Sequence, residues 1–280
     1  MDFNSELIEA RNIARGAGAI LLDHYTPNVK FQYKADSSVV TIADLKANEY
    51  VLSKLRAKFP LDSIVSEEMD TYSGSNKRCW YIDPLDGTSG YVAHTDDFAV
   101  HIGLAIQGAP VLGVIYKPVG DVLYEGILGE GARMNTKGRS FNLTFKPSEG
   151  LVVGCHTKLP ATKMGRLFLD SIECTDLETT GGEGLRIMRL ATNKAHVYVG
   201  NVGLKASSWD LCSPHAIIQS MGGTVQFTNG REVVYTGQGN LGKMYIAGFD
   251  RELLAQSRMV IERIERGFSD VIDPVTKKWV

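Results

Sequence analysis

Several features that would suggest other classes of protein are scarce or missing in this chain. The 280 residues include four cysteines with no Cys-x-x-Cys spacing, which argues against a disulfide framework or a zinc site. No apolar run approaches the roughly 20 residues that span a bilayer, and the acidic, amphipathic N-terminus is unlike a signal peptide. The formal net charge of -2 leaves no basic field for phosphates of DNA or RNA. These absences predict a soluble, cytoplasmic protein that binds no nucleic acid polymer.

The chain also lacks low-complexity tracts, repeats of fixed period and a proline- or serine-rich linker. Apolar residues at steps of three and four predict a helix over residues 4–25, capped by Asn4 or Ser5. A second amphipathic helix is predicted over residues 44–58, with Asp44 at or near its N-terminus.

The middle of the chain changes to a β pattern. From Trp80 to Tyr124, β-branched runs separated by Gln107-Gly108 predict an antiparallel meander, and α and β segments alternate beyond about residue 150. This order predicts an α/β fold of stacked helix and sheet layers. We expect a first half over residues 1–150 and a second half over residues 151–280, sharing an interface.

Two aspartates flank a Pro-Leu step at the end of an apolar run, in the stretch CWYIDPLDGTSGYV. Asp83 and Asp86 would repel each other at short range unless one is protonated or a cation lies between them. Together with the Leu85 carbonyl they form an oxygen donor set that Mg²⁺ or Ca²⁺ favours. Gly87 and Thr88 can hold an anion through N–H groups and a hydroxyl. An aspartate pair at a strand end is also frequent turn chemistry, so both interpretations stand for this stretch alone.

Three other acidic stretches favour the metal interpretation. Glu67 and Glu68 follow a short apolar strand, Asp44 lies at a helix start, and Asp210 follows Trp209 at the start of another helix. Taken singly, Asp44 and Asp210 are equally well explained as helix caps or as ligands. Metal ligands beside an anion cradle are what metal-assisted phosphoryl transfer requires.

Together, the stretches WYIDPLDGTSGY, SSWDLCSPHAII, VTIAD and SEE resemble the signatures of the inositol monophosphatase superfamily of Mg²⁺-dependent, lithium-sensitive phosphatases. The resemblance covers the chain from about Ala14 to Gly248. It implies an αβαβα sandwich of the inositol monophosphatase and fructose-1,6-bisphosphatase type, with two or three Mg²⁺ ions in each active site. The family is commonly dimeric, so a homodimer is an expectation as well.

Carried over residue by residue, the resemblance also implies roles in the site. The implied metal ligands are Glu67, Asp83, the Leu85 carbonyl, Asp86 and Asp210, and Asp83 bridges two ions. A third, weaker ion is implied between Glu67 and Asp44 through water. The implied catalytic residues are Asp44, Thr88 and Glu67, with the Thr88 hydroxyl and Asp44 orienting the attacking water. Gly87 and Thr88 would supply N–H groups to the phosphate, and Glu68 would lie outside the direct ligands.

The substrate is indicated less clearly. Serine before the two glutamates and the run HIGLAIQGAPVLGVIYKPVGDVLY resemble the 3′(2′),5′-bisphosphate nucleotidase branch. The stretch GGEGLRIM falls where the family shapes its leaving-group pocket, so Gly184 and Arg186 are expected to contact the substrate. Arg186 can meet a second phosphate, although a solvated helix residue is an equally good interpretation.

We therefore predict a phosphomonoesterase that removes the 3′-phosphate of adenosine 3′,5′-bisphosphate. The alternatives are an inositol monophosphatase or inositol polyphosphate 1-phosphatase and, more distantly, a non-catalytic metal-dependent binder. Ser89-Gly90-Tyr91 matches neither branch. Gly203 or its neighbours fall near the expected inositol-contacting acid, which weighs against inositol 1-phosphate. The histidines at 94, 101 and 215 are expected to be packed or surface residues.

Overall fold

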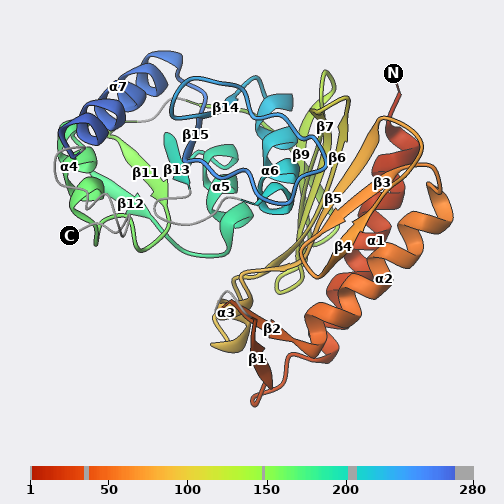
Figure 1. The fold of residues 1–280 in the computed structure, drawn as a ribbon. Coiled ribbons are helices and arrows are strands. Elements are labelled where there is room, and N and C mark those ends of the chain that lie inside the picture. Colours follow the sequence, from red (N-terminus) through yellow and green to blue (C-terminus); the bar gives the residue numbers. More distant parts are fainter. Residues whose placement is uncertain (1, 35–37, 147–148, 201–206, 269–280) are drawn as a thin grey trace.

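The computed structural model describes residues 2–34, 38–146, 149–200 and 207–268. These residues form five stacked layers in the order helix, sheet, helix, sheet, helix, which run from right to left in Figure 1. The predicted αβαβα sandwich is thereby confirmed. The expectation that concerned Gly203 lies outside the described residues.

Two long helices form the first layer. Helix α1 (Asn4–Asp23) buries its alanine-rich face against the first sheet. Its N-cap is Phe3, so the predicted cap at Asn4 or Ser5 is wrong. Helix α2 (Ile42–Lys58) begins two residues earlier than predicted because the Thr41 side chain accepts hydrogen bonds from the first N–H groups of the helix.

The first sheet is the meander predicted from the sequence, extended at both edges. Its eight strands lie in the order β10-β9-β8-β7-β6-β5-β3-β4, and all neighbours are antiparallel except β3 and β5. The turn at Gln107-Gly108 has two positive φ angles, as a tight hairpin needs. The strands are β3 (Ser63–Ser66), β4 (Met69–Tyr72), β5 (Arg78–Asp86), β6 (Ala99–Ile106), β7 (Ala109–Lys117), β8 (Val122–Ile127), β9 (Gly131–Thr136) and β10 (Arg139–Leu143).

The other layers come from the second half of the chain. Helices α5 (Glu183–Ala191) and α6 (Ser208–Ser220) fill the space between the two sheets, and α6 packs on β6 and β7. The second sheet has the order β12-β11-β13-β15-β14, and α4 (Lys163–Ser171) and α7 (Arg251–Phe268) cover its outer face. Its strands are β11 (Val152–Cys155), β12 (Asp176–Glu178), β13 (Val197–Gly200), β14 (Thr224–Phe227) and β15 (Tyr245–Gly248).

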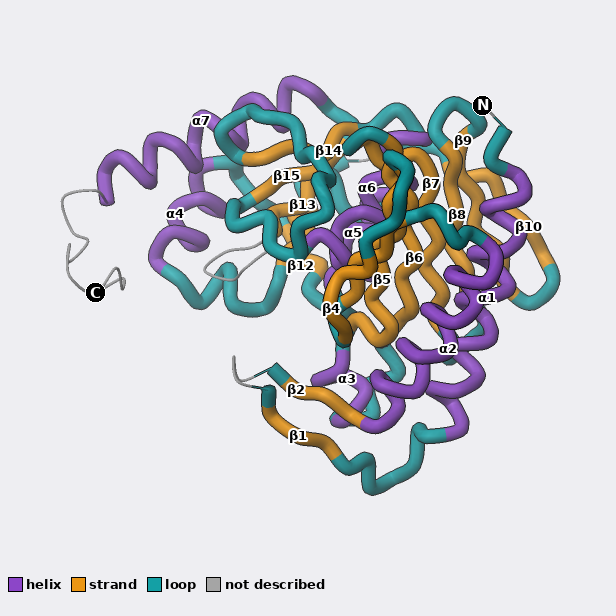
Figure 2. The backbone as a smooth tube through the Cα atoms, turned by 45° about the vertical axis from the view of Figure 1, so that its right-hand side comes forward, coloured by secondary structure: helices purple, strands orange, loops and turns teal. Residues whose placement is uncertain are grey.

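A small projection lies at one end of the first sheet. It holds the hairpin of β1 (Phe31–Tyr33) and β2 (Val39–Thr41) and the short helix α3 (Thr88–Val92), which Figure 2 shows below the body of the molecule. Within the described ranges, none of the helices has the length and apolar character needed to cross a membrane.

Candidate active site

An irregularity in strand β5 turns its two aspartates to the same side. Asp83 lies opposite His101 of β6, and Asp86 lies opposite Ala99, so three steps along β5 match two steps along β6. In a regular strand, residues three apart point to opposite faces. The extra residue of this bulge changes that parity and brings both carboxylates to one face.

Two further acids approach this point from other elements: Asp210 joins the cluster, and Glu67 lines the adjoining cavity. Strand β3 runs parallel to β5 with Ser66 opposite Ile82, so Glu67 and Asp83 leave their strands at the same edge. Asp210 is in the first turn of α6. Oxygen atoms of Asp83, Asp86 and Asp210 all lie within 4.8 Å of one another, which is a separation that one cation can span.

The other expected catalytic residues meet beside this cluster. Asp44 belongs to a capping box at the start of α2, where its Oδ2 accepts hydrogen bonds from the Thr41 N–H (2.8 Å) and hydroxyl (2.5 Å). Its other oxygen, Oδ1, lies 3.4 Å from the Thr88 hydroxyl, which also lies 3.0 Å from the Leu85 carbonyl. Asp44 is therefore both a cap and a member of the site.

Burial, together with the closeness of these acids, changes their pKa values. Burial, with the charges of Glu67 and Asp86 in support, raises the pKa of Asp83 well above its usual value. Burial and the neighbouring acids likewise raise the pKa of Asp210. The pKa of Asp44 is raised to about 6, mainly by burial and against the hydrogen bonds from Thr41. A divalent cation would relieve this repulsion by supplying the missing positive charge.

Asp86 differs from its neighbours because it is held by donors. Its two oxygens accept the backbone N–H groups of Glu183 and Gly184 at the start of α5, both at 2.8 Å. His101 Nε2 lies 3.1 Å from Asp86 Oδ2. Burial favours the neutral acid, but His101, Arg186 and the Glu183 N–H outweigh it and lower the pKa of Asp86. Asp86 is thus the carboxylate of the group that stays charged most readily.

His101 was expected to be a packed or surface residue, and the structure buries it against a candidate ligand. It is fully buried, and it lies on the same face of the sheet as Asp83 and Asp86. A Cβ built on Gly184 would lie 2.3 Å from the His101 ring. Gly184 therefore makes room for the imidazole because it has no side chain. The glycine-rich stretch around it is the one sequence signal for this arrangement.

Gly182 is required by the close approach of α5 to Asp86. Its φ of -68° suits any residue, but an added Cβ would lie about 2.4 Å from the Asp86 carboxylate. We predict that Gly182→Ala separates Asp86 from the helix start and weakens Mg²⁺ binding about 10- to 100-fold, measured by calorimetry. Gly267→Ala, where a Cβ meets nothing within 4 Å, is the matched control. Equal Mg²⁺ affinity in both variants would contradict this role.

Lys34 forms ion pairs with the two consecutive glutamates, Glu67 and Glu68. Its ammonium group lies 2.8 Å from Glu67 and 2.5 Å from Glu68. Burial and the charge of Glu67 raise the pKa of Glu68 to about 7, although Lys34 opposes this. Lys34 could not be predicted as part of the site, because nothing in its local pattern distinguishes it from a surface lysine.

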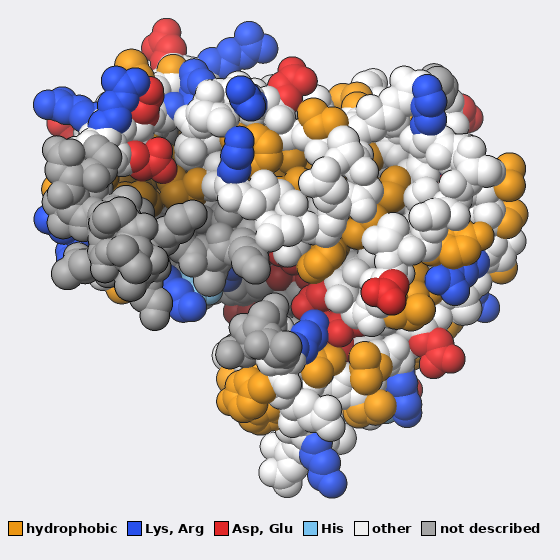
Figure 3. All heavy atoms as spheres, in the orientation of Figure 1, with side chains coloured by type: hydrophobic (Ala, Val, Ile, Leu, Met, Phe, Trp, Pro, Cys, Tyr) orange, Lys and Arg blue, Asp and Glu red, His pale blue; other side chains and the backbone are white. Residues whose placement is uncertain are grey.

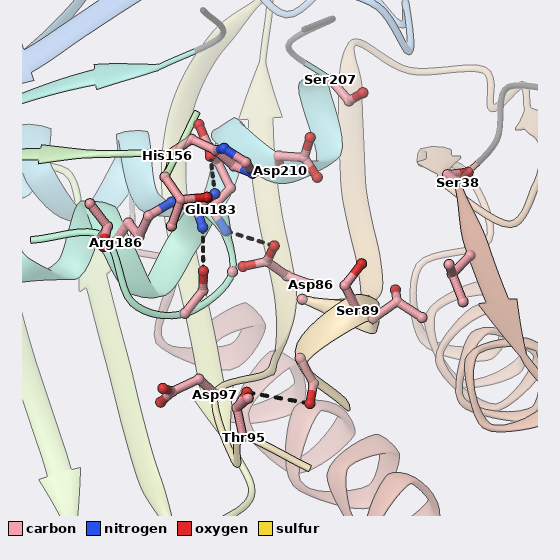
Figure 4. A pocket seen from close by; sticks show the side chains of 18 of the residues that line it. Ser38, Asp86, Ser89, Thr95, Asp97, His156, Glu183, Arg186, Ser207 and Asp210 are labelled. Carbon is pink, nitrogen blue, oxygen red and sulfur yellow. Dashed lines mark hydrogen bonds and ion pairs between the residues drawn. The ribbon is translucent and has the colours of Figure 1, made fainter. Parts of the chain in front are cut away.

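A cavity of about 470 Å³ opens beside the acids. Figure 3 shows acidic side chains gathered in the hollow where the projection meets the body. Gly87 and Thr88 line the cavity. Figure 4 shows Asp86 and Asp210 reaching in from β5 and α6, with Glu183 and Arg186 close to Asp86. Gly184 is not among the lining residues, since it lies behind Asp86 against His101.

Arg186 lines the cavity but is already paired. It is 8% exposed, so it is not a solvated helix residue. Its Nη2 donates to the Glu183 carboxylate at 2.7 Å, its Nη1 to the Gly181 carbonyl, and its Nε to the Tyr198 hydroxyl at 3.3 Å. Its role as a contact for a second phosphate remains a prediction.

Comparison with known proteins agrees with the geometry. The sequence profile of the Inositol monophosphatase family matches residues 4–260. The chain belongs to that family. The solved structure of an inositol monophosphatase from Anabaena covers 94% of this chain, and the chain covers 97% of it, with a TM-score of 0.75 at 24% identity. The fold and the resemblance noted in the sequence are therefore confirmed.

Relatives in the inositol monophosphatase family carry different names. The chain is 28% identical over 233 residues to Nus factor SuhB of Escherichia coli, covering 80% of this chain and 86% of SuhB. It is also 28% identical over 232 residues to the 3′(2′),5′-bisphosphate nucleotidase CysQ of Buchnera aphidicola, covering 80% and 85%. Membership thus supports a phosphatase of small phosphate esters but not one particular substrate.

The residues present fit the magnesium ions that the family uses. All candidate ligands are hard oxygen donors, and no cysteine belongs to the described acidic cluster. Burial and the neighbouring acids raise the pKa of Asp83 and of Asp210, so a bound cation would stabilise their charged forms. Glu67, Asp83, the Leu85 carbonyl, Asp86 and Asp210 remain the predicted ligands.

Proposed function

We propose that this protein is a Mg²⁺-dependent phosphomonoesterase that hydrolyses a small soluble phosphate ester. The proposal is carried by one observation: carboxylate oxygens of Asp83, Asp86 and Asp210 lie within 4.8 Å of one another beside a cavity. Bound Mg²⁺ supplies charge that stabilises the attacking and leaving oxygens of an in-line displacement. The same acids are poorly explained by a structural role, because burying like charges without a cation is unfavourable.

The chain itself positions the phosphate and the water. Gly87 has a φ of +91°, and a Cβ there would lie 2.8 Å from the Asp97 carbonyl, so the tight turn before α3 needs glycine. This turn presents the backbone and hydroxyl of Thr88 to the cavity. The Thr88 hydroxyl lies within reach of both Asp44 Oδ1 and the Leu85 carbonyl. It can donate a hydrogen bond to Asp44, and its oxygen can then accept a hydrogen bond from the attacking water.

Two substrates remain candidates for the hydrolysed ester. The 3′-phosphate of adenosine 3′,5′-bisphosphate is supported by the relative named CysQ and by the position of Arg186 in the cavity wall. Inositol monophosphate is supported by the family and by the several hydroxyl-bearing residues of the cavity wall. The ion pair of Arg186 with Glu183 counts against a second phosphate.

A phosphate-release panel tests the proposal. Purified protein is assayed with adenosine 3′,5′-bisphosphate, adenosine 3′-monophosphate and inositol 1-phosphate, with Mg²⁺, with EDTA, and with Mg²⁺ plus Li⁺. We expect release that requires Mg²⁺ and is inhibited by Li⁺. Failure to release phosphate from any of these esters in Mg²⁺ would leave the non-catalytic binder as the better account.

A further inference from the structure

The part of the cavity wall formed by the start of α5 carries two opposite charges that are paired with each other. Glu183 is the first residue of α5, and its side chain is 18% exposed at the cavity surface. One of its carboxylate oxygens accepts the Arg186 Nη2–H at 2.7 Å, and the other accepts the Tyr245 hydroxyl. Figure 4 shows Glu183 and Arg186 side by side at this wall.

Three of the five N–H groups of the Arg186 guanidinium are already used by the protein, and the charge of the guanidinium is balanced by the Glu183 carboxylate. Each of its three nitrogens already donates to a protein acceptor, and these are Glu183, the Gly181 carbonyl and Tyr198. Among the described residues that line the cavity, Arg186 is the one lysine or arginine. A second phosphate would therefore meet the Glu183 carboxylate next to Arg186, and like charges side by side are unfavourable.

The other polar groups of this wall can form hydrogen bonds with hydroxyl groups of a substrate. His156 Nδ1 accepts the Lys158 N–H at 3.1 Å, so the neutral ring carries its proton on Nε2 as a donor. Burial and the charge of Arg186 lower the pKa of His156, which keeps the ring neutral at pH 7. Thr157 and Thr179 add hydroxyls to the same wall.

We propose that Glu183 is a specificity-determining residue that holds Arg186 in a closed ion pair and so directs the site toward monophosphates with a hydroxyl-bearing leaving group. The inference rests on the proposed phosphomonoesterase function, and it names the class of leaving group. Removal of the carboxylate releases the guanidinium, which then offers a bidentate site to a second phosphate.

The test compares two substrates that differ by one phosphate. Adenosine 3′-monophosphate and adenosine 3′,5′-bisphosphate are assayed with the wild type, Glu183→Ser and the double variant Glu183→Ser/Arg186→Gln. We expect the ratio of kcat/KM for bisphosphate over monophosphate to rise at least about tenfold in Glu183→Ser. The double variant should lose this gain, because the released cation is gone.

Two further variants keep the test decisive. Glu183→Gln removes the charge at nearly constant volume and should raise the same ratio, even where Glu183→Ser folds poorly. Glu178→Ser breaks the ion pair of Glu178 with Arg189, which joins β12 to α5 outside the cavity, and should leave the ratio unchanged. An unchanged ratio in both Glu183 variants, or a gain that survives removal of Arg186, would overturn the proposal.

Failure of the proposed function gives a different result. In that case no ester in the panel releases phosphate, and calorimetric binding of the same two nucleotides to the wild type and Glu183→Ser tests the inference instead. The role of Glu183 is supported if Glu183→Ser binds the bisphosphate more tightly than the wild type does, while the affinity for the monophosphate stays the same. Equal affinities in both proteins contradict it.

Discussion

Asp210→Asn should reduce kcat/KM by about 10³-fold or more while the fold persists. Asparagine keeps the volume of the side chain but removes one of three negative charges that lie within 4.8 Å. Metal-assisted stabilisation of a displacement supplies several kcal/mol, and each 1.36 kcal/mol corresponds to a factor of ten in rate. Steady-state phosphate release in saturating Mg²⁺ measures the loss.

The same variant should gain stability when Mg²⁺ is chelated. Burial and the surrounding acids raise the pKa of Asp210, so its charge opposes folding at neutral pH. We expect the melting temperature of Asp210→Asn in EDTA to equal or exceed that of the wild type. Asp70→Asn, at an exposed position in β4, is the matched control and should change neither activity nor melting temperature. A near-normal rate in Asp210→Asn would mean that the assigned ligands are wrong.

Stabilisation by Mg²⁺ should grow as the pH rises. Folding raises the pKa of Asp44 from 3.8 to about 6 and that of Glu68 from 4.5 to about 7, in each case mainly through burial. A group with a raised pKa binds more protons in the folded state, so its stabilising effect is complete below the unfolded value. That effect is lost as the pH rises through the folded value. In EDTA, stability should therefore fall between about pH 4 and pH 7.

Mg²⁺ replaces the lost protons and should counteract that fall. At about 100 times its dissociation constant, a ligand of the folded state adds about 2.7 kcal/mol. For a chain of this size, this amounts to an increase on the order of 5–10 °C in melting temperature. Calorimetric scans with Mg²⁺ and with EDTA at about pH 5 and pH 8 measure it, and we expect the larger Mg²⁺ shift at pH 8. An equal shift at both values, or none, would contradict a site built from crowded carboxylates.

The positions of Asp83, Asp44 and Asp210 at the ends of strands and helices could be predicted from the sequence, because each lies next to a recognisable pattern. The apolar run before Asp83 predicted a strand, and Asp44 and Asp210 lie at predicted helix starts. Whether Asp44 is a cap or a site residue could not be decided from the pattern. A carboxylate has two oxygens, and the structure uses one for Thr41 and turns the other toward Thr88.

The surroundings of these acids could not be predicted in the same way. Arg186 was expected to be either a phosphate contact or a solvated residue, and its pairing with Glu183 depends on tyrosines from β13 and β15. The contact of His101 with Asp86 depends on the bulge in β5, which no local propensity indicates. Long-range packing decides both, so they appear only when the sheets and α5 are in place.

The proposed function requires carboxylate oxygens from β5, α6 and the end of β3 to surround divalent cations beside a phosphate pocket. Anomalous diffraction from crystals soaked in Mn²⁺ and inorganic phosphate tests this directly. We predict anomalous peaks bounded by the carboxylates of Asp83, Asp86 and Asp210, with phosphate density next to Gly87 and Thr88. Manganese peaks only elsewhere, or an acidic cluster that stays free of metal, would contradict the account.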